Sequence, residues 1–369
     1  MVLGIDASRA VGPRTGVGRN VQHLLRAWAS QTSEFDSIRI FAPTPIDDLP
    51  TDPRFRQEVL PSRMPGIVWQ TRKLGAAARD IDLLFTQYTL PLRYRGRSVV
   101  NNLGIYEGEL AFRGLRARGR SWHIGRSARA AEFVIANSHS TKRDIIRFFD
   151  VPEEKIAVVW PGVADSFHPL RDGDEDESRA VARRFLGEDS TYFLFVGKLS
   201  ARRHILLLLD AFRIAQARHP DLGLLVVGPN TDGLPVEASI AELGLGSRVR
   251  HVGYLDHGVL APLYRGARAF VLPTEHEGFS FTIPEALASG CPVITVKHGA
   301  LAEAGLEDAT LAVASPDADL LADALLRVVE DDRLRDELRA RGLRAAEGLS
   351  WNETARRTMR ILEDVARAA

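Results

Sequence analysis

The segment EGFSFTIPE begins with Glu277 and ends with Glu285, so a ligand at this segment could contact both carboxylates. The apolar run Phe270 to Leu272 just before it is typical of a strand, and a helix is expected to begin inside it. Gly278 lets the backbone approach a ligand closely, and a first helical turn has unpaired N–H groups. Because carboxylates accept hydrogen bonds from hydroxyls and N–H groups bind phosphate, the segment suits a nucleotide sugar. A structural alternative stays open, since Thr282 and Glu285 also match a helix capping box.

A basic pair, Lys198 and Arg203, follows a second strand-like run, Phe193 to Val196, and leads into a helix. Two cations at the start of a helix repel each other and the helix dipole unless an anion lies there. No acidic residue follows them in sequence until Asp210. The pattern therefore indicates an anion site, and a diphosphate is the anion that a nucleotide sugar would bring.

Short apolar runs alternate with longer amphipathic segments along the chain, which is typical of parallel sheets covered by helices. The strand candidates include Val2 to Ile5, Ile38 to Phe41, Leu83 to Phe85, Val134 to Ala136, Ile156 to Val159, Phe193 to Val196, Leu224 to Val227, Phe270 to Leu272 and Val293 to Thr295. The expected helices include Asn20 to Ser30, Leu206 to Arg218, Pro284 to Ser289 and Asp319 to Glu330. The sequence thus predicts an α/β protein.

The length of 369 residues favours two domains. The stretch PLRDGDEDES, residues 169–178, is acidic and polar without an apolar period, which indicates a linker. We expect a first domain over residues 1–168 and a second over 179–350. A final helical stretch, residues 351–369, is expected to pack back on the first domain.

These motifs resemble, in order and spacing, the family-4 glycosyltransferases of GT-B fold, also called glycosyltransferase group 1. EGFSFTIPEALASGCPVIT resembles the family signature, and IDASRAVGPRTGVGRN resembles the family's opening segment. FVIANSHSTKRDI and KIAVVWPGVADSFHP match the end of the first domain, and YFLFVGKLSARRHILLLLDAF the start of the second. HVGYLDHGVLAPLYRGARAFVLPTEHEGFS continues the match. The resemblance implies two doubly wound, Rossmann-like domains that face a central cleft.

The resemblance also implies an activity, which is transfer of a hexose-type sugar from a GDP- or UDP-sugar to an acceptor hydroxyl, with retention and without a metal. Lys198, Arg203 and Glu277 would be the catalytic residues, the basic pair at the diphosphate and Glu277 at the sugar hydroxyls. Glu285 would hold the ribose. The donor site would further include the residues Gly16, Gly18, Gly278, Phe279 and Ser280. The family's usual order of Arg then Lys is exchanged here, which moves the bidentate group to the second position.

One family feature is missing, because many members carry a histidine after a first-domain strand and the stretch 99–109 contains none. Asn101, Asn102, Glu107 or Glu109 could contact the acceptor instead, and the sequence does not choose between them. The donor's departing phosphate can accept the acceptor's proton, so the enzyme interpretation stands. Two alternatives remain, namely a protein that binds nucleotide sugars without transfer, and a nucleotide-sugar hydrolase or epimerase.

A run of arginines without any Asp or Glu between Leu110 and Ala131 indicates an anionic partner on the acceptor side. The six arginines are Arg113, Arg116, Arg118, Arg120, Arg126 and Arg129. The partner would be an anionic, for example lipid-linked, acceptor or an anionic membrane surface. The bland alternative is a solvated helix face, although such faces normally carry both signs.

The bulk composition excludes several other classes. Lys+Arg and Asp+Glu are equal at 48, so no overall field attracts nucleic acid. The single cysteine fits a reducing compartment, and no signal peptide or membrane span is expected, which favours the cytoplasm. The Asp172-Gly-Asp174 pattern lacks a preceding strand, so neither a metal nor another cofactor is expected.

Overall fold

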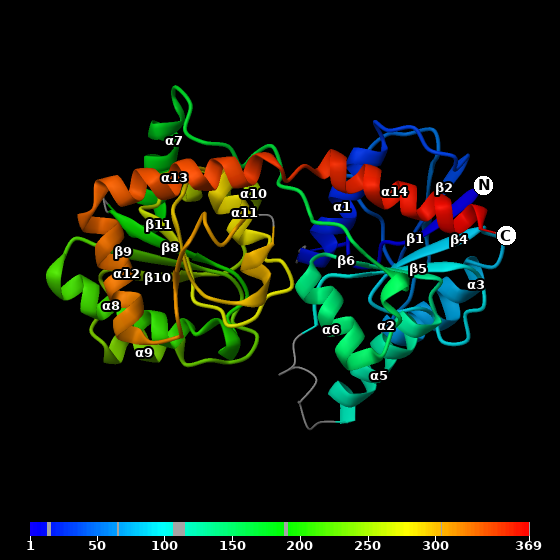
Figure 1. The fold of residues 1–369 in the computed structure, drawn as a ribbon, viewed down its shortest axis with the longest axis horizontal. Helices are drawn as coiled ribbons and strands as arrows, with labels where there is room; N and C mark the ends of the chain where they lie inside the picture. Colours follow the sequence, from blue (N-terminus) through cyan, green and yellow to red (C-terminus); the bar gives the residue numbers. More distant parts are fainter. Residues whose placement is uncertain (13–15, 65, 106–114, 188–190, 304, 369) are drawn as a thin grey trace. The chain divides into compact units, whose positions relative to one another are not determined.

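The computed structural model describes residues 1–12, 16–64, 66–105, 115–187, 191–303 and 305–368. The chain divides into two compact units, one formed by Met1–Gly162 with Ser350–Ala369 and the other by Val163–Leu349 (Figure 1). Each unit is built on one parallel sheet covered by helices on both faces. The predicted α/β class with two doubly wound domains is therefore confirmed.

The sheet of the first unit has seven strands in the order β3-β2-β1-β4-β5-β6-β7. They are β1 (Val2–Asp6), β2 (Ser37–Ala42), β3 (Phe55–Val59), β4 (Leu83–Gln87), β5 (Ser98–Asn102), β6 (Phe133–Ala136) and β7 (Ile156–Val158). Strand order reverses between β1 and β4, the point at which ligands of open parallel sheets bind beyond the carboxyl ends. β3 and β5 were not expected from the sequence.

Helices cover both faces of this first sheet. They are α1 (Gly16–Trp28), α2 (Gly66–Trp69), α3 (Gly75–Ala77), α5 (Leu115–Ala130), α6 (His139–Phe149) and α14 (Trp351–Arg367), with a π-helical turn at Gln70–Leu74 and a 3-10 turn at Glu153–Lys155. The C-terminal helix α14 packs against α1, where the indole Nε1 of Trp28 donates to the carbonyl oxygen of Ala355 at 2.9 Å. Trp28 is 1% exposed, so this contact is part of the unit's core.

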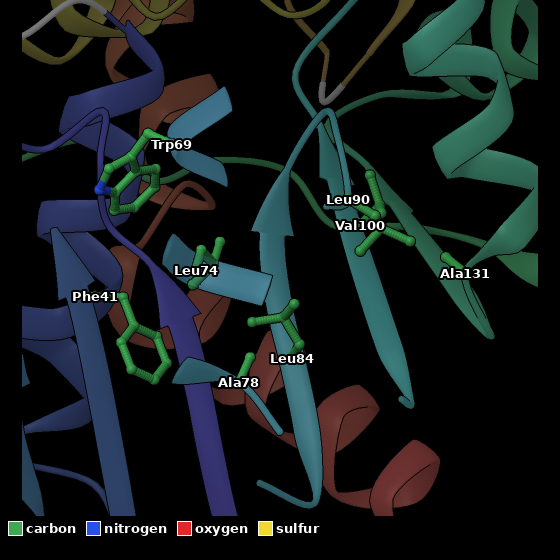
Figure 2. Packing of buried hydrophobic residues seen from close by; sticks show 8 residues of the cluster. All are labelled: Phe41, Trp69, Leu74, Ala78, Leu84, Leu90, Val100 and Ala131. Carbon is green, nitrogen blue, oxygen red and sulfur yellow. The ribbon is translucent and has the colours of Figure 1, made fainter. Parts of the chain in front are cut away.

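Figure 2 shows how the opposite face of this sheet is packed. Phe41, Leu84 and Val100 project from strands β2, β4 and β5 of this sheet. Trp69 and Leu74, on the segment that runs from α2 into the π-helical turn, cover them, and all five side chains are at most 3% exposed. Since burying one such side chain stabilises a fold by roughly 1.5–3 kcal/mol, this cluster fixes the strand ends that carry the polar residues described below.

The second unit contains a six-stranded sheet in the order β10-β9-β8-β11-β12-β13, which repeats the doubly wound pattern. Its strands are β8 (Tyr192–Val196), β9 (Gly223–Val227), β10 (Val249–Val252), β11 (Ala269–Leu272), β12 (Val293–Val296) and β13 (Leu311–Val313). Its helices are α7 (Asp174–Leu186), α8 (Ile205–Arg218), α9 (Val236–Glu242), α10 (His257–Gly266), α11 (Thr282–Ala288), α12 (Ala318–Glu330) and α13 (Asp332–Glu347), with 3-10 turns at Ala201–Arg203 and Gly299–Ala302. Here the order reverses between β8 and β11.

The acidic stretch 169–178 is not a linker, contrary to the expectation from its composition. The unit boundaries fall at Gly162 and Leu349, and Asp174 begins helix α7 of the second unit. Acidic residues in a first helical turn are favoured by the helix dipole, which explains the charge of this stretch. Glu177 also accepts a hydrogen bond from Nη2 of the buried Arg265 at 2.9 Å, which connects α7 to α10.

The single cysteine, Cys291, is buried just before β12 with 2% of its surface exposed. Burial raises the pKa of its thiol well above the usual range, partly opposed by a backbone hydrogen bond at Phe270. The thiol is therefore protonated and shielded at neutral pH.

Candidate nucleotide-sugar site

The motif residues of the second unit meet at the carboxyl edge of its sheet, on both sides of the point where strand order reverses. Lys198 and Arg203 follow β8, and Glu277 follows β11, which is paired with β8 in the sheet. Glu285 lies in the first turn of α11, the next element along the chain. The sequence-predicted residues of this half of the site therefore come together at one edge.

Glu277 is held by two guanidinium groups rather than one. Its Oε1 accepts from Nη1 of Arg202 at 2.6 Å and from Nε of Arg203 at 2.9 Å. Arg202 also donates to the carbonyl oxygen of His276 at 2.5 Å, and the hydroxyl of Thr274 lies 3.4 Å from the same Oε1. All contacts of this carboxylate that the described residues show converge on Oε1, so Oε2 is the oxygen left for a ligand hydroxyl.

The charge state of Glu277 follows from these contacts. Burial alone would raise the pKa of this carboxyl, but the guanidiniums of Arg203 and Arg202 outweigh burial and lower the pKa from the usual 4.5 to about 2. Glu277 is 7% exposed, so the ion pairs are shielded from solvent. A fixed negative charge thus stands next to two fixed positive charges at neutral pH.

Both residues of the basic pair have acidic partners, which come from distant segments of the sequence. Glu277, far away in sequence, neutralises Arg203, and Nζ of Lys198 lies 2.7 Å from Oδ1 of Asp232. The Lys198–Asp232 pair is exposed, with 50% and 38% of the side chains accessible, so it is weak and can be exchanged for another anion. Arg202, which was not part of the predicted basic pair, donates to Thr274, His276 and Glu277 and so belongs to the same cluster.

The turn after β8 depends on a glycine. Gly197 has φ of +153°, and a Cβ placed on it would lie 2.3 Å from Nη1 of Arg203. Only a residue without a side chain lets the Arg203 guanidinium lie against the backbone here. The same guanidinium donates to the carbonyl oxygen of Lys198 at 3.3 Å, which fixes it over the strand end.

The start of α11 is not a capping box. Its N-cap residue is Phe281, without a side-chain capping hydrogen bond, and the hydroxyl of Thr282 pairs instead with that of Ser280 at 3.1 Å. Glu285 is 5% exposed within the first turn. Ser280 has a left-handed φ of 62°, a conformation that costs energy for a residue with a side chain and that gathers at functional sites. Phe279 is 2% exposed and packs in the core, so its ring does not line an accessible surface.

The predicted glycine loop of the first unit is part of a helix. Gly16 begins α1 and Gly18 lies in its first turn, so Asn20 is a buried helical residue and not the start of the helix. The Oδ1 of Asn20 accepts from Nδ2 of Asn101 at 3.0 Å. Asn20 thus lies inside the helix with a partner within the fold, and the helix begins four residues earlier than expected.

A set of buried polar side chains lies at the carboxyl edge of the first sheet. Nδ2 of Asn101 donates to Oε1 of Gln87 as well as to Asn20, and Nε2 of Gln70 donates to Oδ2 of Asp6 at 3.0 Å. Asn102 is fully buried, and its Oδ1 accepts from the backbone N–H of Gly104 at 3.1 Å. The members of this amide cluster are Asp6, Asn20, Gln70, Gln87, Asn101 and Asn102. Nε2 of Gln87 and Nδ2 of Asn102 are buried donors without a partner in the described structure.

The prediction named only part of this cluster. The other members could have been found from polar residues at the ends of buried strands. Gln87, for example, ends the strand that begins at Leu83. Of the other first-domain candidates, Glu107, Glu109 and Arg113 lie outside the described residues, as does the side chain of Arg116.

The described arginines of α5 do not form one surface. Arg118 and Arg120 are exposed, and the neighbouring Trp122 is 57% exposed. Arg129 instead donates to the carbonyl oxygen of Phe149 at 2.8 Å and so helps to hold α6. Arg118 and Arg120 are therefore exposed arginines of α5 for which the described residues show no partner, and they lie beside an exposed indole.

Metal ligands and membrane spans were also considered. Within the described ranges, His, Cys, Asp and Glu side chains form no group of three or more that could hold a metal ion. Asp174 of the acidic stretch accepts from the N–H of Arg171 at 2.9 Å, as a turn residue does. Among the described helices none is long and apolar enough to cross a membrane.

Comparison with known proteins agrees with this architecture. A family model described as glycosyl transferases group 1 matches residues 176–344, and one described as glycosyltransferase family 4 matches residues 14–167. The D-inositol 3-phosphate glycosyltransferase of Nocardioides sp. is 31% identical over 79% of this chain and 65% of its own length. The O-antigen chain mannosyltransferase B of Escherichia coli is 27% identical over 66% of this chain and 64% of its own length. The matches thus span slightly less than two thirds of these relatives' lengths.

Solved structures give the same fold over the whole chain. Sucrose-phosphate synthase from Thermosynechococcus elongatus superimposes with a TM-score of 0.80 at 21% identity, covering 100% of both chains. Anabaena HepE, solved with UDP and glucose, has a TM-score of 0.77 at 17% identity and covers 98% of both chains. The fold is therefore that of the GT-B class. The chain belongs to the family-4, or group 1, glycosyltransferases.

Proposed function

We propose that this protein transfers a hexose-type sugar from a nucleoside-diphosphate sugar, bound by the second unit, to a hydroxyl group of an acceptor bound by the first unit. The observation that carries the proposal is the buried Glu277 carboxylate, held by Arg202 and Arg203 where the strand order reverses. This arrangement offers fixed charges of both signs at the place where open parallel sheets bind nucleotides. HepE, a structural neighbour, was solved with UDP-glucose, which supports a donor of this class.

In this proposal each donor group has a matching side chain. Oε2 of Glu277 accepts from sugar hydroxyls, and Glu285 accepts from the ribose. Arg203 and Lys198 meet the diphosphate, Lys198 by exchanging Asp232 for a phosphate oxygen. The bond from the sugar's anomeric carbon to the phosphate oxygen breaks, and one to the acceptor oxygen forms. The acceptor attacks on the face from which the diphosphate departs and passes its proton to that diphosphate, so transfer occurs with retention. The cations stabilise the departing charge in place of a metal.

The amide cluster of the first unit supports an acceptor rich in hydroxyl groups. Gln87 and Asn102 each keep a buried N–H donor without a partner, and buried donors of this kind are normally satisfied by a ligand or water. An anionic group on the same acceptor would meet Arg118 and Arg120. Relatives such as D-inositol 3-phosphate glycosyltransferase and mannosylfructose-phosphate synthase are named after phosphorylated compounds, which favours an acceptor with an anionic group.

Turnover tests this function directly. A thermal-shift screen of UDP, GDP and their sugars selects the donor, and release of the nucleoside diphosphate is then followed with inositol 3-phosphate and sugar phosphates as acceptors. We expect release only when donor and acceptor are both present, and equal rates with and without EDTA. Release without an acceptor would point to a hydrolase, and binding without release to a non-catalytic relative. Loss of turnover in EDTA that is restored by Mg²⁺ or Mn²⁺ would contradict the metal-free mechanism.

The exposed basic surface gives a second test. Replacing Arg118 and Arg120 with Gln should raise the KM for an anionic acceptor, or release the protein from anionic liposomes, while donor affinity stays unchanged. The difference should fade as salt rises, because exposed charges are screened beyond about 10 Å at 0.1 M. Replacing the exposed Arg56 and Arg63 with Gln removes equal charge elsewhere on this unit and should be silent. If both double variants change the KM or liposome binding equally, Arg118 and Arg120 belong to an ordinary solvated surface.

A further inference from the structure

His298 is a partly exposed residue of the second unit whose ring nitrogens are nevertheless buried. Nδ1 and Nε2 of its ring are both buried and have no hydrogen-bond partner among the described residues. Other histidines of this unit have partners, since His204, His219 and His251 lie 2.6 to 3.0 Å from glutamate oxygens. A buried polar atom without a partner is costly and rare, so an imidazole with two such atoms calls for a ligand or an ordered water.

The position of His298 places it at the candidate donor site. It follows β12 and starts the 3-10 turn Gly299–Ala302, whose first hydrogen bond runs from Leu301 N to His298 O at 3.0 Å. β12 is the sheet neighbour of β11, with Leu272 opposite Thr295. His298 and Glu277 therefore leave the same carboxyl edge from adjacent strands.

Electrostatic contacts place the imidazole close to the same cluster. Burial lowers the pKa of His298 from its usual 6.5 to about 4, with the Glu277 carboxylate opposing and His276 and Arg202 adding to the shift. The ring is thus neutral at pH 7 and presents one N–H donor and one nitrogen acceptor. A phosphate group offers acceptors and no donor at full charge, whereas a hydroxyl group both donates and accepts.

We propose that His298 is a specificity-determining residue of the donor site, whose two ring nitrogens exchange hydrogen bonds with hydroxyl groups of the transferred sugar. This inference rests on the proposed function and deepens it. Glu277 and Arg202 lie at the charged side of the sugar, and His298 provides the neutral side. A sugar that lacks or inverts the hydroxyl facing His298 leaves a buried nitrogen unpaired, which is how a site rejects the wrong sugar.

The test replaces the ring and its polarity separately. His298→Phe keeps a planar ring and removes both nitrogens, and His298→Gln keeps a donor and an acceptor. Calorimetry gives the affinity for the nucleoside-diphosphate sugar that the wild type binds most tightly, and for the matching nucleoside diphosphate alone. We expect His298→Phe to weaken the sugar nucleotide about tenfold and to leave the diphosphate within about twofold, and His298→Gln to recover part of the loss. His219→Phe, at a histidine paired with Glu330 on the surface, is the matched control and should change neither affinity.

Two further readings decide the outcome. Without ligand, the melting temperature of His298→Phe should equal or exceed that of the wild type, because two unpaired buried nitrogens are gone. Deoxy-sugar donors should bind the wild type less tightly than the full sugar nucleotide. The donor that lacks the hydroxyl facing His298 should bind His298→Phe with the same affinity as it binds the wild type. A lower melting temperature, or equal weakening of sugar nucleotide and diphosphate, would assign His298 to structure and overturn the inference while the proposed function stands. A wild type that binds neither compound would overturn the proposed function itself.

Discussion

Replacing Glu277 with Gln should destabilise the second unit by roughly 3–5 kcal/mol, the cost of breaking a buried ion pair from one side. The carboxylate pairs with Arg202 and Arg203 at 2.6 and 2.9 Å, and glutamine would leave these two largely shielded guanidiniums without their counter-charge. Urea-induced unfolding measures the change. Glu275→Gln is the matched control two residues away, because Glu275 pairs with His204 through a side chain that is 52% exposed. That variant should stay within about 0.5 kcal/mol of the wild type.

The ion pairs of Glu277 also determine how the stability of the second unit changes with pH. The pKa of Glu277 is lowered in the folded protein from the usual 4.5 to about 2. A lowered carboxyl pKa contributes stability that is fully present above pH 4.5 and is lost as the pH falls towards 2. Subtracting the acid unfolding profile of Glu277→Gln from that of the wild type should isolate this loss. A wild-type profile parallel to that of the variant between pH 4.5 and 2 would show that the ion pairs do not form.

Replacing Glu285 with Gln should weaken nucleoside-diphosphate binding by about 1.5–3 kcal/mol, the value of a hydrogen bond to a charged group. This corresponds to roughly 10- to 150-fold in Kd. Glu285 is 5% exposed in the first turn of α11, where the capping role that could have explained it is not formed. Titration calorimetry with UDP or GDP measures the effect.

The control for Glu285 separates binding from helix stability. Glu242→Gln, at the exposed end of α9, makes the same chemical change away from the site and should leave affinity unchanged. If Glu285→Gln lowers the melting temperature and binds the nucleotide as tightly as the wild type, Glu285 serves the helix and the ribose contact is wrong.

The sequence predicted most interior strands but missed β5, and among the edge strands it predicted β7 but not β3, β10 or β13. β1, β8 and β11 are buried on both faces and read as continuous apolar runs that the sequence shows plainly. β3, β10 and β13 lie at sheet edges, and polar residues such as those of FRQEV in β3 interrupt their pattern. The acidic stretch 169–178 was wrongly predicted to be a linker, because an exposed first helical turn and a linker have the same polar composition.

The site could be predicted as a set of segments but not as a set of contacts. The spacing of Glu277 and Glu285 follows from one strand and one helix, which local pattern describes. The partners of Arg202, Arg203 and Lys198 come from distant segments that only the sheet topology brings to the same edge. The role of His298 leaves no trace in sequence, because an unsatisfied buried nitrogen is a property of packing.

The burial of Cys291 makes the protein a convenient object for site-directed labelling. Its protonated, shielded thiol reacts poorly with maleimides, which attack through the thiolate form. A cysteine introduced at an exposed position, such as that of Tyr254 in the second unit, would therefore be the only fast-reacting thiol without prior removal of the native one. A fluorophore attached there would label the second unit at one defined position, in a protein whose core has been left untouched.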